Sequence, residues 1–537
     1  MTEPVTCGVA LMRLLKAYGV DTVFGMPGVH TLELYRDLAR IGIRHIGVRH
    51  EQGAGFMADG YARVSGRPGV CLVISGPGVT NAATPMGQAY ADSVPMLVVS
   101  SVAERRDLGM GRGRLHEISA QDAVTGPLTA FSAIALDPEE VPELVARAFA
   151  VFTSQRPRPV HISIPLDVIT APASFAPVPR QGAAGPAPNA AAVRRAADLL
   201  IKAKRPVVVV GGGAARHGSL VRRLAEKLGA AVVPTIAAKG VVPDGHPLVL
   251  ESTLEREATQ GFVAAADVVL VVGSELAEPD LWAPEGKLRL EGAMIRVDID
   301  AAVLLRDYAP EVAIQGDAGA TLAELVRLIE PSNAAGPGFA GTDAIARARA
   351  AARADLTALE RKHLHVLGAL REALPPDGFV MTDMSQIVYT GYGFFPCSRP
   401  QTYMFPVGYG TLGFALPAAI GAKLAQPERQ GVALAGDGGL LFTVQELATA
   451  VEHRLPLAVV LWNNDALAQI RDGFVKRGIA PVSTSPHNPD FLMLAQAFGC
   501  RAVRAASLDH FKGELTAAFA ADAPTLIEVR EDAPFLA

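Results

Sequence analysis

Two short apolar runs in the C-terminal part of the chain, each ending in polar residues, constrain its fold more than any other feature. The first run, VALA, is followed by Gly436-Asp437-Gly438, and the second, LAVVLW, by Asn463-Asn464. The intervening segment TVQELATAVEHRLP has the pattern of an amphipathic helix, which predicts a strand, a crossover helix and a parallel strand. Both strands of such a unit finish at the same edge of the sheet, where ligands bind.

The polar residues at these strand ends are suited to hold a cation against a phosphate group. Gly438 and Gly439 let the backbone approach an anion, and the helix that follows offers free N–H groups. Asp437 and Asn464 supply the oxygen ligands that Mg²⁺ prefers when it is shared with substrate phosphates. The alternative is an ordinary turn with an ordinary Asn-Asn loop, and the combination of the two pieces argues against it.

The composition indicates a globular chain without a nucleic-acid or membrane partner. Half of the 537 residues are hydrophobic, 19% are charged, and no apolar run approaches the length of a membrane span. The formal net charge of -5 is small and no basic block is present, so nucleic-acid binding is not expected. No signal peptide is expected either. Four isolated cysteines are interpreted as reduced thiols of a cytoplasmic protein: Cys7, Cys71, Cys397 and Cys500.

Two segments rich in proline, glycine and alanine divide the chain. These segments, residues 171–191 and 330–343, are interpreted as linkers between domains at 1–172, 190–330 and 344–537. Within each part, apolar β-branched runs such as CLVIS, PVVVVGG and LAVVLW alternate with helical patterns. That alternation predicts three doubly wound α/β domains, each with a parallel sheet.

A glutamate in the first domain connects the metal-site motif to a known family. Glu51 stands in the run VRHEQGAGFMADGYAR, followed by the turn GPGVTNAATP. Together with the GDG and Asn-Asn pair, this H-E-x-x-A setting resembles thiamine diphosphate enzymes of the acetolactate synthase and 2-oxo acid decarboxylase superfamily. Their cofactor needs a partly buried carboxyl group beside N1′ of its aminopyrimidine, which favours the imino form that acts as base. A helix-terminal glutamate that satisfies nearby backbone donors is the alternative.

The resemblance implies a set of cofactor and metal contacts. The Mg²⁺ ligands would be Asp437, the side chain of Asn464 and the backbone carbonyl of Ala466. The carbonyl of Gly410 would hold the 4′-amino group, and Leu412 would wedge the cofactor into a V shape. The other implied cofactor contacts are Gly25, Pro27, Gly28, Gly76, Ser385, Gln386, Gly436, Gly438, Gly439 and Leu467.

Candidate substrate residues lie in two segments. The first is the dipeptide His116-Glu117, which the resemblance places toward the substrate as a proton relay or as a partner of a polar tail; a solvated surface loop is the alternative. The second segment follows the metal motif and supplies Leu467, Gln469, Ile470 and Asp472. Many relatives carry Gly and Tyr where this chain has Ala466 and Leu467, and acetolactate synthases carry His where it has Ile387.

The resemblance also bears on assembly and on the middle domain. In this superfamily the cofactor lies between domains of different subunits, which implies a homodimer or homotetramer. The triplet Gly211–Gly213 follows a predicted strand of the middle domain and does not fit GxGxxG. FAD is therefore not expected, although some relatives hold FAD or an ADP group there.

The N-terminal motifs look closest to the branch of 5-guanidino-2-oxopentanoate decarboxylases. This implies thiamine diphosphate- and Mg²⁺-dependent loss of CO₂ from a 2-oxo acid through an ylide and an enamine, with release of an aldehyde. A guanidinium tail would need a carboxylate, which Glu117 or Asp472 could supply. Two alternatives stay open: a carboligase that joins the enamine to a second carbonyl compound, and an inactive paralogue that serves as a scaffold subunit.

Overall fold

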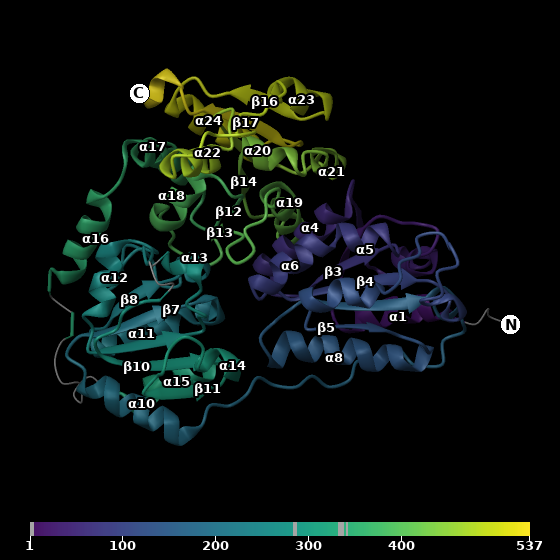
Figure 1. Ribbon diagram of the computed structural model, residues 1–537, viewed down its shortest axis with the longest axis horizontal. Coiled ribbons are helices and arrows are strands. Elements are labelled where there is room, and N and C mark those ends of the chain that lie inside the picture. The colour runs from purple at the N-terminus through teal and green to yellow at the C-terminus, as the bar shows by residue number, and fades with distance from the viewer. Residues whose placement is uncertain (1–4, 283–286, 331–337, 340–341) are drawn as a thin grey trace.

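Three parallel β-sheets, each covered by helices, follow one another along the chain in a computed structural model (Figure 1). The structure describes residues 5–282, 287–330, 338–339 and 342–537. All strand pairs within the three sheets are parallel. The prediction of three doubly wound α/β domains is therefore confirmed.

The N-terminal sheet has the strand order β2-β1-β3-β4-β6-β5. Its strands are β1 (Thr22–Gly25), β2 (Arg44–Gly47), β3 (Gly69–Val73), β4 (Met96–Val102), β5 (Phe131–Ile134) and β6 (Val160–Pro165). Its helices are α1 (Cys7–Ala17), α2 (Leu32–Tyr35), α3 (Leu38–Ile41), α4 (Glu51–Ser65), α5 (Pro77–Asn81), α6 (Ala83–Ala91), η1 (Arg105–Asp107), α7 (Gln121–Thr125), η2 (Gly126–Leu128), η3 (Pro138–Glu140), α8 (Val141–Ser154) and α9 (Leu166–Ile169). The central strands β3, β4 and β6 are buried along their whole length, because helices cover both faces.

The middle sheet has the strand order β11-β10-β9-β7-β8. Its strands are β7 (Pro206–Val210), β8 (Ala231–Pro234), β9 (Val268–Val272), β10 (Ala293–Asp298) and β11 (Val312–Gln315). Its helices are α10 (Ala190–Lys202), η4 (Gly212–His217), α11 (Gly218–Leu228), η5 (Ile236–Ala238), α12 (Glu257–Ala264), α13 (Glu278–Leu281), α14 (Ala301–Leu304) and α15 (Ala318–Leu328). In the triplet Gly211–Gly213, a Cβ at Gly211 would lie 2.2 Å from the carbonyl oxygen of Gly273. Close backbone packing is thus sufficient to explain this glycine.

The C-terminal sheet has the strand order β13-β12-β14-β15-β17-β16. Its strands are β12 (Phe379–Thr382), β13 (Tyr403–Met404), β14 (Gly431–Gly436), β15 (Leu457–Asn463), β16 (Arg501–Arg504) and β17 (Thr525–Arg530). The helices from the second linker onward are α16 (Ala344–Ala354), α17 (Ala358–Ala373), α18 (Gln386–Phe394), α19 (Ala415–Ala425), α20 (Asp437–Leu441), α21 (Glu446–Glu452), α22 (Ala468–Lys476), α23 (Phe491–Ala497), α24 (Leu508–Phe519) and η7 (Pro534–Leu536). Strands β14 and β15 pair in parallel, as the two apolar runs predict.

The crossover between β14 and β15 differs from the single predicted helix. It contains two short helices, α20 and α21, separated by turns at residues 442–445. Within this break the hydroxyl of Thr443 donates to the carbonyl oxygen of Gly413 at 2.8 Å. This hydrogen bond anchors the break between α20 and α21 to the segment before α19.

Other predictions concern the linkers, the cysteines and the membrane. Most of the predicted linker at 330–343 lies outside the described residues, and the other linker has no helix or regular strand between residues 173 and 189. Each of the four cysteines is buried and has a free thiol. In the described part of the chain, no helix combines the length and apolar character required to cross a membrane.

Helices α4 and α19 join the N-terminal and C-terminal domains at their backbones (Figure 1). A Cβ at Gly60 would lie 2.0 Å from the carbonyl oxygen of Ala418, and a Cβ at Gly421 would lie 1.9 Å from that of Met57. Neither contact leaves room for a side chain. The two helices can therefore pack this closely only because each presents glycine to the other.

This packing predicts that Gly60→Ala destabilises the protein. The added methyl group must push the two backbones apart, which costs on the order of 1–3 kcal/mol or more. Gly368→Ala in α17 is the control, because a Cβ at Gly368 meets nothing within 4 Å and alanine favours a helix. We expect a lower midpoint of thermal unfolding for Gly60→Ala and an unchanged or higher one for Gly368→Ala. Equal midpoints for both variants would contradict the prediction.

Candidate active site

The carboxylate of Asp437 organises the edge of the C-terminal sheet. Asp437 follows the last residue of β14, and its Oδ1 accepts a hydrogen bond from the backbone N–H of Gly438 at 3.0 Å. Its Oδ2 accepts from the N–H of Ala466 at 3.2 Å and from Nδ2 of Asn488 at 2.8 Å. Burial raises the pKa of Asp437, while these donors lower it. The structure thus brings together Asp437 and Ala466, two of the predicted metal ligands.

The two asparagines after β15 have different environments. Nδ2 of Asn463 donates to Glu528 at 2.7 Å, and its Oδ1 accepts from the N–H of Asp465 at 3.0 Å. Asn463 therefore shapes the turn, in which Asp465 has a positive φ of 52°. Nδ2 of Asn464 donates to Glu531 at 3.1 Å, which directs the amide oxygen of Asn464 away from Glu531. This oxygen suits a cation, as the sequence predicts for Asn464.

A cradle for an anion lies beside the cation ligands. The hydroxyl of Ser385 is buried and has no hydrogen-bond partner among the described residues. A Cβ at Gly436 would lie 3.1 Å from Cβ of Ser385, and a Cβ at Gly438 would lie 2.8 Å from the side chain of Leu467. A buried hydroxyl without a partner is unusual in a native protein. The combination of a free hydroxyl, closely approached glycines and Asp437 fits a diphosphate with its metal ion.

Glu51 begins α4 in the N-terminal domain and is not needed as its cap. The cap is His50, whose Nδ1 accepts from the N–H of Gln52. Only 8% of Glu51 is exposed, and its Oε2 accepts from Nδ2 of Asn81 at 3.0 Å. A Cβ at Gly78 would lie 3.4 Å from Oε1 of Glu51, so the predicted GPG turn passes next to the carboxylate. This environment favours a functional carboxyl group over the alternative of a helix-capping glutamate.

Asn81 and Gln121 are two residues near this site that the sequence analysis missed. Gly76, with a positive φ of 63°, donates its N–H to Oε1 of Gln121 at 3.0 Å. Nε2 of Gln121 in turn donates to Ser100 and Ser163, and also to the carbonyl of Ser101. The turn beside Glu51 is therefore fixed by a buried polar network. Its only sequence signal is polar residues at the carboxyl ends of apolar strands.

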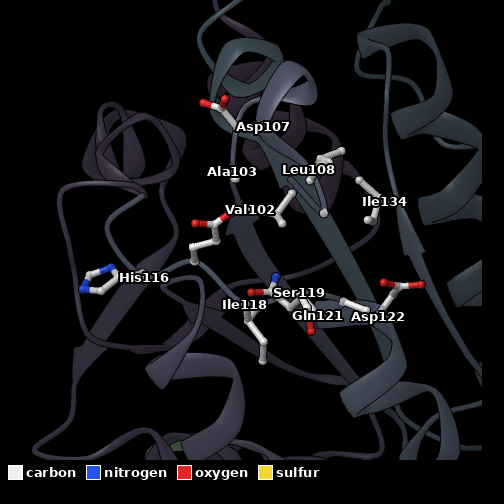
Figure 2. Close-up of a pocket in the computed structure, with 13 residues that line it drawn as sticks. Val102, Ala103, Asp107, Leu108, His116, Ile118, Ser119, Gln121, Asp122 and Ile134 are labelled. Carbon is white, nitrogen blue, oxygen red and sulfur yellow. The ribbon is translucent and has the colours of Figure 1, made fainter. Parts of the chain in front are cut away.

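The predicted dipeptide His116-Glu117 lies in a loop that is held by hydrogen bonds between its own residues. A cavity of about 90 Å³ lies next to this loop. In Figure 2 the His116 ring projects to one side, away from Asp122 and Ile134. His116 has a positive φ of 61° and a buried Nδ1 without a partner among the described residues. Glu117 accepts from the backbone N–H groups of residues 112 and 114, at 3.1 and 2.9 Å, which lower its pKa. Glu117 thus stabilises the loop itself.

The candidate substrate residues of α22 meet a predicted cofactor residue. Nε2 of Gln386 donates to Asp472 at 3.1 Å and to Oε1 of Gln469 at 3.4 Å. Ile470 is 56% exposed on the same helix. Gln386 directly follows Ser385, so this polar cluster is one residue away from the anion cradle. The structure therefore groups Gln386, Gln469 and Asp472, which the sequence assigned to different roles.

The remaining predicted cofactor residues lie at the end of β1 and just after it, in α20, and in the segment before α19. A Cβ at Gly25 would lie 2.0 Å from the carbonyl oxygen of Leu72, and one at Gly439 would lie 2.9 Å from the carboxyl carbon of Asp383. Gly410 has a positive φ of 66°. Close packing or backbone conformation is sufficient to explain these three glycines. The other members of this group are Pro27, Gly28 and Leu412.

Comparison with known proteins supplies the family. Three family models match: "Thiamine pyrophosphate enzyme, N-terminal TPP binding domain" over residues 5–124, the central domain over 193–325, and the C-terminal TPP binding domain over 383–529. The chain belongs to the thiamine pyrophosphate enzymes. The family resemblance expected from the motifs of Glu51, Asp437 and Asn464 is therefore confirmed.

Its relatives include decarboxylases and acetolactate synthases. The chain is 52% identical to the probable 2-ketoarginine decarboxylase AruI of Pseudomonas aeruginosa, over 98% of this chain and 94% of that protein. It is 32% identical to the large subunit of acetolactate synthase isozyme 1 of Escherichia coli, over 97% and 93%. Identity to the acetolactate synthase large subunit IlvB1 of Mycobacterium tuberculosis is 33%, over 94% and 84%.

The buried network behind Gln121 predicts a pH dependence of stability. His161 is fully buried between Ser100 and Thr125, and burial lowers its pKa from 6.5 to about 4. The unfolded chain therefore binds the proton more tightly than the folded one. Above about pH 6.5, His161 is neutral in both states and the free energy of unfolding has its full value. About 3 kcal/mol of this free energy is lost as the pH falls from there toward 4.

His161→Gln tests this dependence, because it keeps hydrogen bonding and removes the titration. We expect the thermal midpoint of the wild type to exceed that of the variant most at pH 7 and least near pH 4. His487→Gln, at an exposed position, serves as the control and should follow the wild type. A constant difference between the wild type and His161→Gln across this range would refute the assignment.

Proposed function

We propose that this chain is a thiamine diphosphate- and Mg²⁺-dependent decarboxylase that converts 5-guanidino-2-oxopentanoate, or 2-ketoarginine, to CO₂ and an aldehyde. The observation that carries the proposal is 52% identity to the probable 2-ketoarginine decarboxylase AruI over almost the whole of both chains. The bond between the carboxylate carbon and the ketone carbon breaks, and a proton takes the place of CO₂. The aldehyde keeps the guanidino group unchanged.

The candidate site consists of two half-sites, one around Glu51 and one around Asp437, and the residues of both fit the cofactor. Asp437, Asn464 and the carbonyl of Ala466 would hold Mg²⁺, while Ser385 and the glycines after β14 would contact the diphosphate. When bound, thiamine diphosphate supplies a carbon nucleophile and an electron sink for the loss of CO₂. Glu51, oriented by Asn81, would hydrogen-bond to the aminopyrimidine and favour its basic form.

The guanidinium end of the substrate would contact α22. Asp472 offers a carboxylate whose side chain is 54% exposed, and Gln469 adds an amide oxygen one turn earlier. A guanidinium group carries five N–H donors in a planar fork, which suits such a pair of acceptors. Asp472 is preferred over Glu117 because backbone N–H groups hold both oxygens of the Glu117 carboxylate. Among the described residues, Asp472 is contacted only by side-chain donors that can rotate away, those of Gln386 at 3.1 Å and Arg471 at 3.4 Å.

Assembly and location complete the proposal. The family resemblance implies a homodimer or homotetramer in which the cofactor lies between Glu51 of one subunit and Asp437 of another. Four buried free thiols are consistent with a cytoplasmic enzyme.

A carboligase of the acetolactate synthase type is the second candidate. Identities of 32–33% to acetolactate synthases over most of both chains favour it. The two candidates share the loss of CO₂ and differ in whether a proton or a second carbonyl compound is added afterwards. Product analysis therefore separates them.

The first test measures CO₂ and product from a panel of 2-oxo acids with thiamine diphosphate and Mg²⁺ present. We expect aldehyde from 5-guanidino-2-oxopentanoate and at least a hundred-fold lower kcat for Glu51→Gln, the range of a lost acid–base contribution. Acetolactate from pyruvate as the main product would establish the carboligase instead. Full activity of Glu51→Gln, or no CO₂ from any 2-oxo acid, would refute the proposal.

Asp472→Asn tests the guanidinium contact. Loss of a charge-assisted hydrogen bond of about 1.5–3 kcal/mol predicts a roughly ten- to hundred-fold lower kcat/KM for the guanidino substrate. An uncharged 2-oxo acid of similar length should lose less than three-fold. Asp509→Asn is the control, because its side chain is 92% exposed on α24. Equal losses for both substrates would exclude Asp472 from recognition.

A further inference from the structure

Glu446 is a fully buried carboxylate that connects α21 of the C-terminal domain to the start of α4. Its Oε1 accepts from the backbone N–H groups of Arg49 and His50, both at 3.0 Å. Its Oε2 accepts from the hydroxyl of Thr449 at 2.7 Å and lies 3.3 Å from the Arg49 nitrogen. Arg49 and His50, whose backbone N–H groups Glu446 binds, are the two residues immediately before Glu51.

The fit around this carboxylate leaves little freedom. A Cβ at Gly53 would lie 2.5 Å from Oε1 of Glu446, so α4 also touches the carboxylate two residues beyond its start. Burial raises the pKa of Glu446, and the hydrogen bonds from Thr449, Arg49 and His50 oppose that rise. A buried carboxylate is costly unless such donors satisfy it. A hydrophobic side chain could fill this space but could not accept the two backbone N–H groups.

We propose that Glu446 is a positioning residue that fixes Glu51 through the backbone of Arg49 and His50. This inference rests on the proposed function of Glu51 as the group that contacts the cofactor. His50 is the cap of α4 and Glu51 is its first residue, so the backbone position of residues 49–50 sets that of Glu51. Displacing a reacting group by about 1 Å can cost a hundred-fold in rate.

The same carboxylate links both half-sites within one chain. Glu446 begins α21, and the short α20 immediately before it begins at Asp437. The segment that supplies the proposed metal ligand is therefore tied to the segment that supplies the proposed catalytic carboxyl group. A change at Glu446 is expected to act on Glu51 and to leave Asp437 free to bind Mg²⁺.

The test compares Glu446→Ala and Glu51→Gln alone and in combination, in the full-length enzyme with cofactor and Mg²⁺. We expect Glu446→Ala to lower kcat at least ten-fold with less than three-fold change in substrate KM. In the Glu51→Gln background the same substitution should lower kcat by less than two-fold, because its effect passes through Glu51. Equal losses in both backgrounds would overturn the inference.

Two further variants keep the test decisive. Glu446→Gln retains the volume and one acceptor oxygen, so it should fold even where alanine does not, with a smaller loss of kcat and the same non-additivity. Glu452→Gln is the matched control, because Glu452 lies on the same helix and pairs with the side chain of Arg49 at 2.7 Å on the surface. Its kcat should stay within two-fold of the wild type; a loss equal to that of Glu446→Gln would contradict the inference.

A second readout requires neither cofactor nor turnover. Hydrogen exchange of the peptide containing residues 48–52 should be at least five-fold faster in Glu446→Gln and unchanged in Glu452→Gln, because only the first replaces the charged acceptor of those amides by a weaker, neutral one. Unchanged exchange in Glu446→Gln would overturn the inference. If Glu51→Gln alone retains full activity, the proposed function of Glu51 fails, whatever the exchange shows.

Discussion

The backbone contact between α4 and α19 is the constraint on which the rest of the structure depends. With glycine at positions 60 and 421, the helices approach until the atoms of one main chain touch those of the other. The carboxylate of Asp92 also connects the two domains, because it accepts hydrogen bonds from the backbone N–H groups of residues 407 and 408. The N-terminal and C-terminal domains are therefore packed together through these two helices. Glu446 adds hydrogen bonds to the backbone immediately before α4.

Buried carboxylates held by neutral donors recur around the C-terminal sheet edge. Asp437, Glu446 and Asp383 each accept backbone N–H groups, and burial raises the pKa of all three, that of Asp383 to about 6. Burial disfavours the charged form of these groups, and the hydrogen-bond donors around them only partly offset that effect. A divalent cation beside Asp437 would favour the ionised form, so a metal ion would stabilise the charge that this part of the fold leaves uncompensated.

Much of the fold and part of the site could be predicted because both follow from local pattern. Alternating apolar strands and amphipathic segments define parallel sheets, and parallel sheets bring strand ends such as Gly436 and Asn463 to one edge. The contact of Asp437 with Ala466 follows from that geometry. Contacts of Asn488, Asn81 and Gln121 could not be predicted, because each arises where distant segments meet and leaves no periodic signal. The different environments of Asn463 and Asn464 likewise depend on Glu528 and Glu531, which come from the far end of the chain.

The loop that carries His116 has one consequence for binding. Glu117 accepts from its own backbone, and the buried Asp107 forms ion pairs with Arg112 at 2.6 Å and with Arg114 at 2.8 Å. The conformational entropy of this segment is therefore lost when the protein folds and is not lost again when a ligand arrives. A small molecule that contacts the loop meets a preorganised surface, so ordering of the loop lowers neither its affinity nor its association rate constant.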